Sequence, residues 1–476
     1  MNLIERYKKL PVTVKATFWA AICGTIQKGI SVITTPIFTR LLSTEEYGFY
    51  TAYNSWFQIF VMVTTFNLTN AVFNKGLSKY SEDKDGYMSS MLGTTTIITG
   101  ICFVVYLVFH RIINDFTELG TLVTVLMFAE LLVYPAYNFW IMRRRYDFKY
   151  RAVVSVTLCM AICNAGIGIL AVLYANDKGL ARVLSVILVN FVFGLFLYIK
   201  VFSEGRKFYV SEYAKFSIIF NIPLIPHYLS TYILDQSDRI MIQKMCGLEF
   251  VGIYGVAYSL GLVMKIFTSS IGQSLIPWEY RQLKENKYND INKQTVNILI
   301  GAGVLLIMFM AVAPEAMHIL APDKYMDAIY IVPSVTASVF FMLAYNIFSN
   351  VEFYFDANKF TMVMSLVGAL LNLVLNYIFI QIYGYIAAGY TTLFCYIVFT
   401  VGHFWYCQSV AKKKIGTVIF DAKKVITLSI VMTASTIGLT LLYDYAVVRY
   451  ALLLMGIIIA YLKRNSIIQM AKQLRK

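Results

Sequence analysis

The feature that most constrains this chain is a series of apolar runs, each about 20 residues long and separated by short polar connections. An α-helix of that length rises about 30 Å, which is the thickness of the hydrocarbon core of a bilayer. Only 14% of the 476 residues are charged, 59% are hydrophobic, and the mean hydropathy is +0.65. These values exclude a soluble globular protein and predict a polytopic, all-α membrane protein.

Hydropathy along the chain predicts about fourteen transmembrane helices. An even number of spans places both termini on the same side of the membrane. We expect the spans near residues 14–39, 47–74, 88–110, 118–142, 152–174, 180–202, 214–243, 250–277, 295–321, 328–355, 361–382, 386–408, 425–443 and 446–462.

Positive charge lies mainly on one side of this predicted topology. The two termini and the alternate connections between spans hold 31 of the 41 Lys and Arg residues, including the run at 143–145 and the run at 412–414. Short cytoplasmic loops are enriched in Lys and Arg, so we expect both termini in the cytoplasm. The net charge of +15 then indicates topology and contact with anionic lipids, and no nucleic-acid site.

The short connections limit the chemistry that the chain can perform. The longest, 200–215 and 409–424, leave no room for an extramembrane catalytic domain. The sequence has neither a G-x-x-x-x-G-K-[ST] phosphate loop nor an H-E-x-x-H metal motif. Its seven cysteines lie in or beside apolar spans without a C-x-x-C pair. We therefore expect a membrane transporter with no catalytic residue, no cofactor and no metal.

A short internal similarity predicts that the chain is duplicated. A shift of 204 residues aligns L-L-S-T-E-E-Y-G-F-Y, from Leu41, with M-C-G-L-E-F-V-G-I-Y, from Met245. The two segments follow predicted spans 1 and 7, so each half has six spans and both halves run in the same direction. A chance match between two helix starts is the alternative. The duplication divides the chain into an N-lobe at 1–203, a C-lobe at 204–408, and two further spans with a cytoplasmic tail at 409–476.

Two segments resemble a known family. K-G-I-S-V-I-T-T-P-I-F-T-R-L-L-S-T-E-E-Y-G-F-Y (Lys28 to Tyr50) and I-P-L-I-P-H-Y-L-S-T-Y-I-L-D-Q-S-D-R-I-M-I (Ile222 to Ile242) are similar to the first and seventh helices of the bacterial oligosaccharide flippases of O-antigen and capsule type. Those flippases belong to the multidrug, oligosaccharidyl-lipid and polysaccharide exporter superfamily. The resemblance implies a V-shaped bundle of two six-helix lobes around a cavity lined mainly by spans 1, 2, 7 and 8.

The resemblance also implies a function and a location. It implies a flippase in the bacterial cytoplasmic (inner) membrane that moves a polyisoprenyl-pyrophosphate-linked oligosaccharide outward for cell-surface polysaccharide biosynthesis. Its partners would be that glycolipid, the surrounding membrane lipids and a polysaccharide polymerase.

Cations inside the membrane are the first candidates for a substrate site, because a charge at the bilayer centre costs about 2.5 to 3.5 kcal/mol. Lys28, Arg239 and Lys265 lie on helices that the resemblance places at the cavity. Lys28 and Lys265 have no acid within one turn of their own helix, and we expect them, with Arg239, to bind pyrophosphate or acidic sugars. An ion pair between Arg239 and Asp235, one helical turn earlier, is the alternative for Arg239.

Other titratable residues are candidates for ion coupling. With no ATP motif, outward transport would draw on a proton or sodium gradient, or on consumption of the product outside. Glu315 and Glu352 lie nearer to span ends, and we expect them to be structural. The ion-coupling candidates are Asp235, Asp238, Glu130 and His227.

Asparagines and prolines complete the set of candidate residues. Asn67, Asn70 and Asn74 recur at helical spacing in span 2, and we expect them to bind saccharide hydroxyls, with hydrogen bonding between helices as the alternative. Pro223 and Pro226 in span 7 predict a kink and are hinge candidates. In spans 10 and 11 we expect the asparagines to join helices; these are Asn346, Asn350, Asn372 and Asn376.

Three alternative functions stay open at this point. A cation-coupled multidrug exporter of the same superfamily would need an acidic, aromatic cavity for cationic drugs. A flippase for the peptidoglycan lipid precursor would share the fourteen spans and the cationic cavity. A membrane glycosyl polymerase or ligase usually carries a large external loop, and no such loop is predicted here.

Overall fold

The computed structural model describes residues 29–30, 33–357 and 359–462 of the chain. These residues form helices joined by short turns, with no β-strand among them. Eleven of the described segments are long and apolar enough to cross a membrane. The chain is therefore a polytopic all-α membrane protein, as the sequence predicted.

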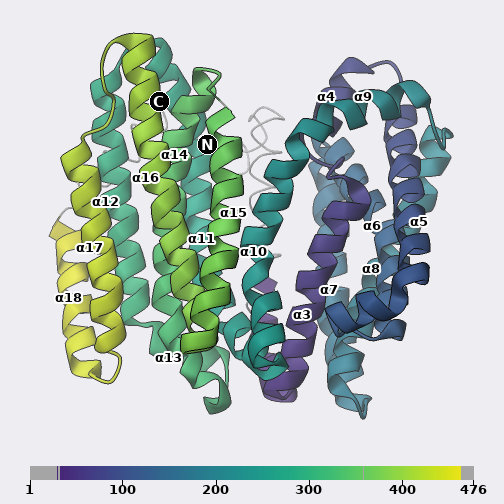
Figure 1. The fold of residues 1–476 in the computed structure, drawn as a ribbon, viewed down its shortest axis with the longest axis horizontal. Coiled ribbons are helices and arrows are strands. Elements are labelled where there is room, and N and C mark those ends of the chain that lie inside the picture. The colour runs from purple at the N-terminus through teal and green to yellow at the C-terminus, as the bar shows by residue number, and fades with distance from the viewer. Residues whose placement is uncertain (1–28, 31–32, 358, 463–476) are drawn as a thin grey trace, which may run out of the picture. The chain divides into compact units, whose positions relative to one another are not determined.

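The described chain divides into two compact units, residues 1–236 and 237–476. In unit 1, a helical segment at 33–41 is followed by α3 (Thr44–Thr65), α4 (Ala71–Lys79), α5 (Lys84–Thr117), α6 (Thr121–Tyr146), α7 (Tyr150–Tyr174), α8 (Lys178–Gly205), α9 (Ser211–Asn221), η1 (Ile222–Leu224) and the first half of α10 (Ile225–Cys246). Unit 2 holds the rest of α10, then α11 (Leu248–Lys284), α12 (Tyr288–Ala311), α13 (Ala313–Leu320), η2 (Asp323–Ile331), α14 (Val332–Tyr354), α15 (Lys359–Tyr383), α16 (Ala387–Ile415), α17 (Ala422–Leu441) and α18 (Ala446–Leu462) (Figure 1).

The eleven segments correspond to eleven of the fourteen predicted spans. The predicted span at 47–74 is α3 followed by α4, and the span at 446–462 is the shorter apolar helix α18. The first predicted span, at 14–39, lies largely outside the described residues.

Helices α3 and α11 begin at the positions that the internal similarity aligns. The Ser43 hydroxyl accepts a hydrogen bond from the Glu46 backbone N–H (3.0 Å), and the Glu46 carboxylate accepts one from the Ser43 N–H (2.7 Å). This capping box satisfies backbone donors that the first turn of α3 leaves free. Helix α3 starts at Thr44 and α11 at Leu248, so the two starts are 204 residues apart (248 − 44).

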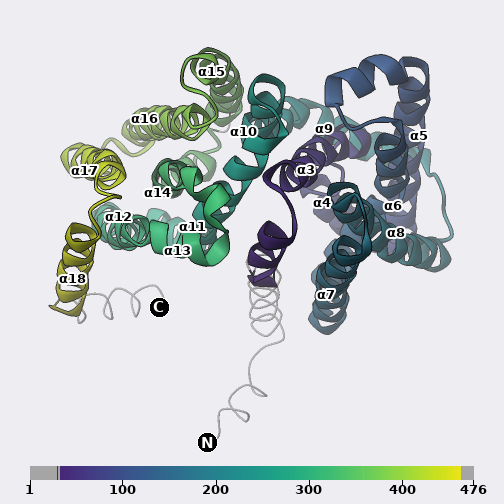
Figure 2. The same cartoon turned by 90° about the horizontal axis from the view of Figure 1, so that it is seen from below.

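Each unit has its own core. In unit 1, Phe73, Tyr87 and Phe139 are buried, and the ring of Phe73 lies 4.8 Å from that of Phe139 and 5.7 Å from that of Tyr87, centroid to centroid. The Tyr87 hydroxyl is also hydrogen-bonded to the Ser217 hydroxyl of α9 at 2.8 Å. In unit 2, α14 packs against α11, α12, α16 and α17 and is the most buried helix (Figure 2).

The second predicted span is broken, which corrects the expectation that its three asparagines share one helical face. Helix α3 ends at Thr65, and Phe66 and Asn67 have φ of 47° and 53°. The Thr65 hydroxyl accepts a hydrogen bond from the Asn67 N–H (3.1 Å). Such side-chain bonds compete with the helical backbone pattern, and a left-handed residue cannot continue the helix.

A second break lies where Pro223 and Pro226 predicted a kink. Helix α9 ends at Asn221, a 3₁₀ turn covers Ile222–Leu224, and α10 begins at Ile225. The side-chain amide of Asn221 donates a hydrogen bond to the backbone carbonyl of Phe66. The breaks in the two spans therefore lie side by side within unit 1, where α4 and α9 pack together (Figure 1).

Candidate functional site

A buried carboxyl in unit 2, that of Asp238, accepts hydrogen bonds from three other helices. Its Oδ1 accepts from the Asn376 side-chain amide of α15 (2.7 Å). Its Oδ2 accepts from the Tyr254 hydroxyl of α11 (2.6 Å) and the Thr392 hydroxyl of α16 (2.8 Å). Asp238 is 2% exposed, so these contacts replace water almost completely. The sequence predicted a role in ion coupling for Asp238 and a role in joining helices for Asn376.

Further polar side chains extend the Asp238 cluster. Asn372, one turn before Asn376 on α15, accepts hydrogen bonds from Ser237 (2.7 Å) and from the Asn376 amide (3.1 Å). Its own amide donates to the Thr392 hydroxyl at 3.1 Å. Thr391 donates to the Asn376 carbonyl oxygen. The cluster therefore brings several oxygen atoms around one carboxyl inside the helix bundle.

This arrangement suits a proton or a monovalent cation. The hydrogen-bond donors to Asp238 are neutral hydroxyl and amide groups, while Arg239 lies within electrostatic range on the same helix. Oxygen ligands from carboxylate, amide and hydroxyl groups are those that hard cations prefer. Within the described part of the chain, no three His, Cys, Asp or Glu residues come close enough to hold a metal ion together.

A second buried acid, Glu130, lies in unit 1. Its carboxylate accepts hydrogen bonds from the Tyr53 hydroxyl of α3 (2.6 Å) and the Asn190 amide of α8 (2.7 Å). Asn190 is oriented in turn by the Asn164 amide of α7, at 3.2 Å. Glu130 is buried and, like Asp238 in unit 2, it accepts hydrogen bonds from neutral side chains of other helices. The sequence identified Glu130 but not the residues that surround it.

The three predicted substrate-binding cations have different outcomes. Lys28 lies outside the described residues. Lys265 lies on α11 and is half-buried, and no ion pair joins its ammonium group to an acid among the described residues. The Arg239 guanidinium lies 4.1 Å from the centroid of the Tyr258 ring, which is a cation–π contact. Lys265 thus lies on a helix long and apolar enough to cross a membrane, and its role in binding an anionic ligand stays a prediction.

The remaining predicted residues lie in unit 1. The Asn70 amide donates to the Asn67 side-chain oxygen at 2.5 Å, so these two asparagines bond to each other at the break after α3. Asn74 is exposed on α4. The His227 ring lies 5.7 Å from the Tyr228 ring, and Asp235 is half-buried on α10. Pro223 and Pro226 lie in η1 and in the first turn of α10.

Sequence reasoning did not identify Arg182 as a candidate site residue. Arg182 is 6% exposed near the start of α8. Its guanidinium lies 3.9 Å from the Phe38 ring centroid and 4.6 Å from that of Tyr50. The internal similarity aligns Tyr50 with Tyr254, and the Tyr254 hydroxyl contacts Asp238. This alignment was the signal in the sequence that pointed to Tyr50 and so to the arginine beside it.

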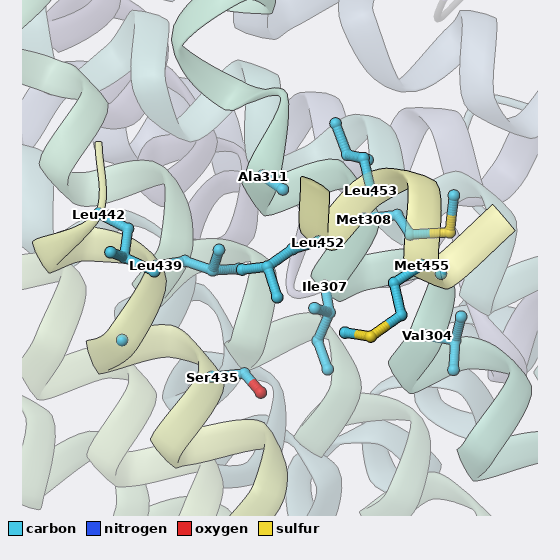
Figure 3. A pocket seen from close by; sticks show the side chains of 12 residues that line it. Val304, Ile307, Met308, Ala311, Ser435, Leu439, Leu442, Leu452, Leu453 and Met455 are labelled. Carbon is cyan, nitrogen blue, oxygen red and sulfur yellow. The ribbon is translucent and has the colours of Figure 1, made fainter. Parts of the chain in front are cut away.

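An apolar cavity of about 290 Å³ lies between α12, α17 and α18 (Figure 3). Ile307, Leu439 and Leu452 point toward one another across it, and Met308 and Met455 contribute thioethers. Ser435 is the polar side chain among the lining residues. This lining suits hydrocarbon and offers no partner to a charged head group.

Comparison with known proteins places these features in context. Residues 13–282 match the family described as polysaccharide biosynthesis protein. Over 332 residues the chain is 23% identical to Lsg locus putative protein 1 of Haemophilus influenzae, a match that covers 68% of this chain and 80% of that protein.

Solved structures of membrane transporters have a similar fold. The lipid II flippase MurJ, in an inward closed conformation, has a TM-score of 0.68 at 14% identity, over 96% of this chain and 99% of that one. A multidrug resistance MATE family transporter of the MOP superfamily, in an inward-facing conformation, has a TM-score of 0.54 at 14% identity, over 82% of this chain and 96% of that one. At these identities the similarity shows a shared fold.

Proposed function

Because the chain belongs to the polysaccharide biosynthesis protein family and has the fold of MOP-superfamily transporters, we propose that it is a flippase for a polyisoprenyl-pyrophosphate-linked oligosaccharide. The proposed direction is from the cytoplasmic to the outer leaflet of a bacterial cytoplasmic membrane, for O-antigen or capsule biosynthesis. A polysaccharide polymerase that consumes the exported unit is the proposed partner.

The family match is the observation that carries this proposal. It covers residues 13–282, more than half of the chain, and includes Lys28, Asp238, Arg239 and Lys265. These residues supply positive charge for a pyrophosphate and one buried acid for a coupling ion. A polysaccharide-biosynthesis protein built as a polytopic helix bundle, with short connections, is better suited to moving a glycolipid than to synthesising one.

The energetic problem of flipping is the saccharide head group. Each hydroxyl that loses its hydrogen bonds costs about 1 to 3 kcal/mol, so several sugars cannot enter hydrocarbon unaided. In our proposal the protein supplies a polar path while the lipid tail stays in the bilayer. Lys265, with Lys28 and Arg239, neutralises the pyrophosphate through charge-assisted hydrogen bonds. Alternating access of the two halves then exposes the head group on the outer side.

Asp238 is the proposed coupling residue. A proton or sodium ion that enters with the membrane potential supplies about 2.3 kcal/mol per charge per 100 mV. Binding of that ion neutralises a carboxyl on which α10, α11, α15 and α16 converge. Ion occupancy therefore changes how tightly these four helices are held together. Glu130 is the second candidate, because its contacts likewise join α3, α6 and α8.

The test is flux of a fluorescent isoprenyl-pyrophosphate oligosaccharide in proteoliposomes. We expect Lys265→Ala to lower flux by about 10- to 100-fold, since a hydrogen bond to a charged group is worth about 1.5 to 3 kcal/mol. Lys265→Arg keeps the charge and should retain much of the flux. Lys178→Ala, which removes a half-buried lysine at the start of α8, is the matched control and should behave as wild type.

Two further arms of the same assay address coupling and the alternative functions. Asp238→Asn should abolish the response of flux to whichever gradient, proton or sodium, accelerates the wild-type protein. Wild-type silence across several glycans, together with ion-driven efflux of cationic dyes, would establish the multidrug-exporter alternative instead. Flux restricted to the peptidoglycan precursor would establish the other flippase alternative.

A further inference from the structure

A second cluster of buried titratable side chains lies in unit 2, at the end where α11 and α14 finish and α15 begins. It consists of Glu279 on α11, Glu352 on α14 and His403 on α16, all of them 1% exposed or less. Thr361 contacts this cluster and Asn376 contacts Asp238, and these residues are fifteen positions apart on α15 (376 − 361), or about 22 Å along the helix. The two clusters are therefore separate sites.

Glu352 and His403 form a buried carboxylate–imidazole pair. The imidazole Nδ1 lies 2.9 Å from Oε1 and 3.1 Å from Oε2 of Glu352. The Thr361 hydroxyl donates to Oε2 at 3.2 Å. The His403 ring lies 5.6 Å from both the Tyr345 and the Phe360 ring centroids. In this apolar surrounding an imidazolium balances the charge of the carboxylate, whereas a neutral imidazole leaves that charge uncompensated.

Glu279 is only half satisfied. Its Oε2 accepts a hydrogen bond from the Asn350 amide at 3.1 Å, but its Oε1 is buried without a hydrogen-bond partner. An ionised carboxylate in that position would carry an uncompensated charge in a low-dielectric interior, which costs several kcal/mol. A proton on Glu279 removes the charge. Cys407 lies within electrostatic range of both Glu279 and Glu352, which places the two carboxyls in one cluster.

Other charged and titratable groups lie on the helices around this cluster. Lys293 of α12 and Lys423 and Lys424 of α17, the helices on the other side of α14, are exposed at the same end of the unit. The titratable groups on the packed helices themselves are Tyr280 and Arg281 of α11, Tyr345 of α14, Lys359 of α15 and Cys407 of α16, with Asp356 in the turn before α15.

We propose that Glu279, Glu352 and His403 form a proton-binding site, distinct from the Asp238 cluster. With a proton on Glu279 and another on His403, the cluster carries no net charge. Loss of either proton leaves a negative charge buried where α11, α14 and α16 pack, so these helices must loosen to admit water. The helices around α14 therefore pack most tightly when the site is protonated.

The test is the pH dependence of thermal unfolding of the purified full-length protein in detergent. In the proposed site the buried Glu279 keeps a proton that the unfolded chain releases, so stability falls as pH rises. Between about pH 6 and 9 we expect the Tm of wild type to fall, and Glu279→Gln to lose at least about half of that shift. Glutamine keeps the shape of the neutral carboxyl, so the low-pH Tm should be retained.

Controls separate this result from a general effect of the substitution. Glu212→Gln removes an exposed acid from α9 and should keep the full wild-type shift. Glu279→Met removes the titrating group with an apolar side chain and serves if the glutamine variant does not fold. An unchanged pH shift in Glu279→Gln would overturn the proposal, as would a wild-type Tm that rises with sodium in place of choline at fixed pH and loses this response in Glu279→Gln. The measurement needs no substrate, so its outcome is independent of the proposed flippase activity.

Discussion

At the scale of single residues, the acids Glu315 and Asp238 of unit 2 are compensated in two different ways. Glu315 forms a bidentate pair with Arg449, in which Nη1 lies 2.8 Å from Oε2 and Nη2 lies 2.8 Å from Oε1. Tyr450 donates to the same carboxylate at 2.8 Å, and Arg449 also donates to the Ala311 carbonyl at 2.7 Å. Asp238, by contrast, is held by neutral donors. A fixed ion pair suits a structural role, whereas a carboxyl without a bonded cation suits an exchangeable ion.

The Glu315 pair leads to a prediction with a defined sign in pH. The hydrogen bonds from Arg449 lower the pKa of Glu315 to about 2. Because the folded pKa lies below the unfolded value of about 4.3, the stabilisation is present at neutral pH and is lost as pH falls toward about 2. Arg449→Ala should lower stability by about 2 to 3 kcal/mol, less than for a fully buried pair because Glu315 is about one-third exposed.

Thermal unfolding of Arg449→Ala, Glu315→Gln and the double variant at neutral pH measures this coupling. The two single variants should each lose stability, and the double variant should lose less than their sum. Additive losses would show that the pair is not coupled. Over the acid range, Glu315→Gln should be less sensitive to falling pH than wild type.

How far the sequence predicts the site differs from residue to residue. Asp238 could be identified because a charge inside an apolar span is rare and therefore conspicuous. Tyr254, Asn376 and Thr392 could not be assigned to it, because their contacts depend on how distant helices pack. Glu279 lies just beyond the predicted span at 250–277 and was therefore not a candidate. Hydropathy does not reveal that α11 continues to Lys284 and that Glu279 is buried within it.

At the scale of elements, the two helix breaks of unit 1 differ in how far the sequence predicts them. Pro223 made the break between α9 and α10 predictable, because proline removes a backbone donor. The break between α3 and α4 contains no proline, and it depends on left-handed Phe66 and Asn67, so hydropathy and spacing alone predicted a continuous helix. The Asn221 side-chain amide joins the two breaks, because it donates a hydrogen bond to the backbone carbonyl of Phe66.

Removing this link should therefore destabilise unit 1. Asn221 is 1% exposed, and Asn221→Ala leaves the Phe66 carbonyl without the donor that it supplies, so we expect a loss of about 1 to 3 kcal/mol, measured as a lower Tm of the purified protein. Asn74→Ala, an exposed asparagine on α4, is the matched control and should change stability by less than about 0.5 kcal/mol. Equal Tm values for the two variants would show that the link does not hold the breaks together.

At the scale of the whole molecule, hydropathy and charge were the most informative parts of the sequence. Apolar runs predicted the long helices because a bilayer requires each span to satisfy its own backbone hydrogen bonds. The repeated segment correctly aligned the starts of α3 and α11. Helix pairing, such as the central place of α14, depends on side-chain fit between helices and was beyond a reading of a single sequence.

The distribution of basic residues predicts the orientation of the chain in the membrane. With 31 of 41 basic residues on one face, the connection at 143–151 and the Lys412–Lys414 run should lie in the cytoplasm, where anionic lipids also favour them. In a cysteine-free background, the variant Arg145→Cys should react with a membrane-impermeant maleimide only in permeabilised cells. A cysteine at Asn176, in the turn between α7 and α8, should react in intact cells. The reverse pattern would contradict the orientation and, with it, the proposed outward direction of transport.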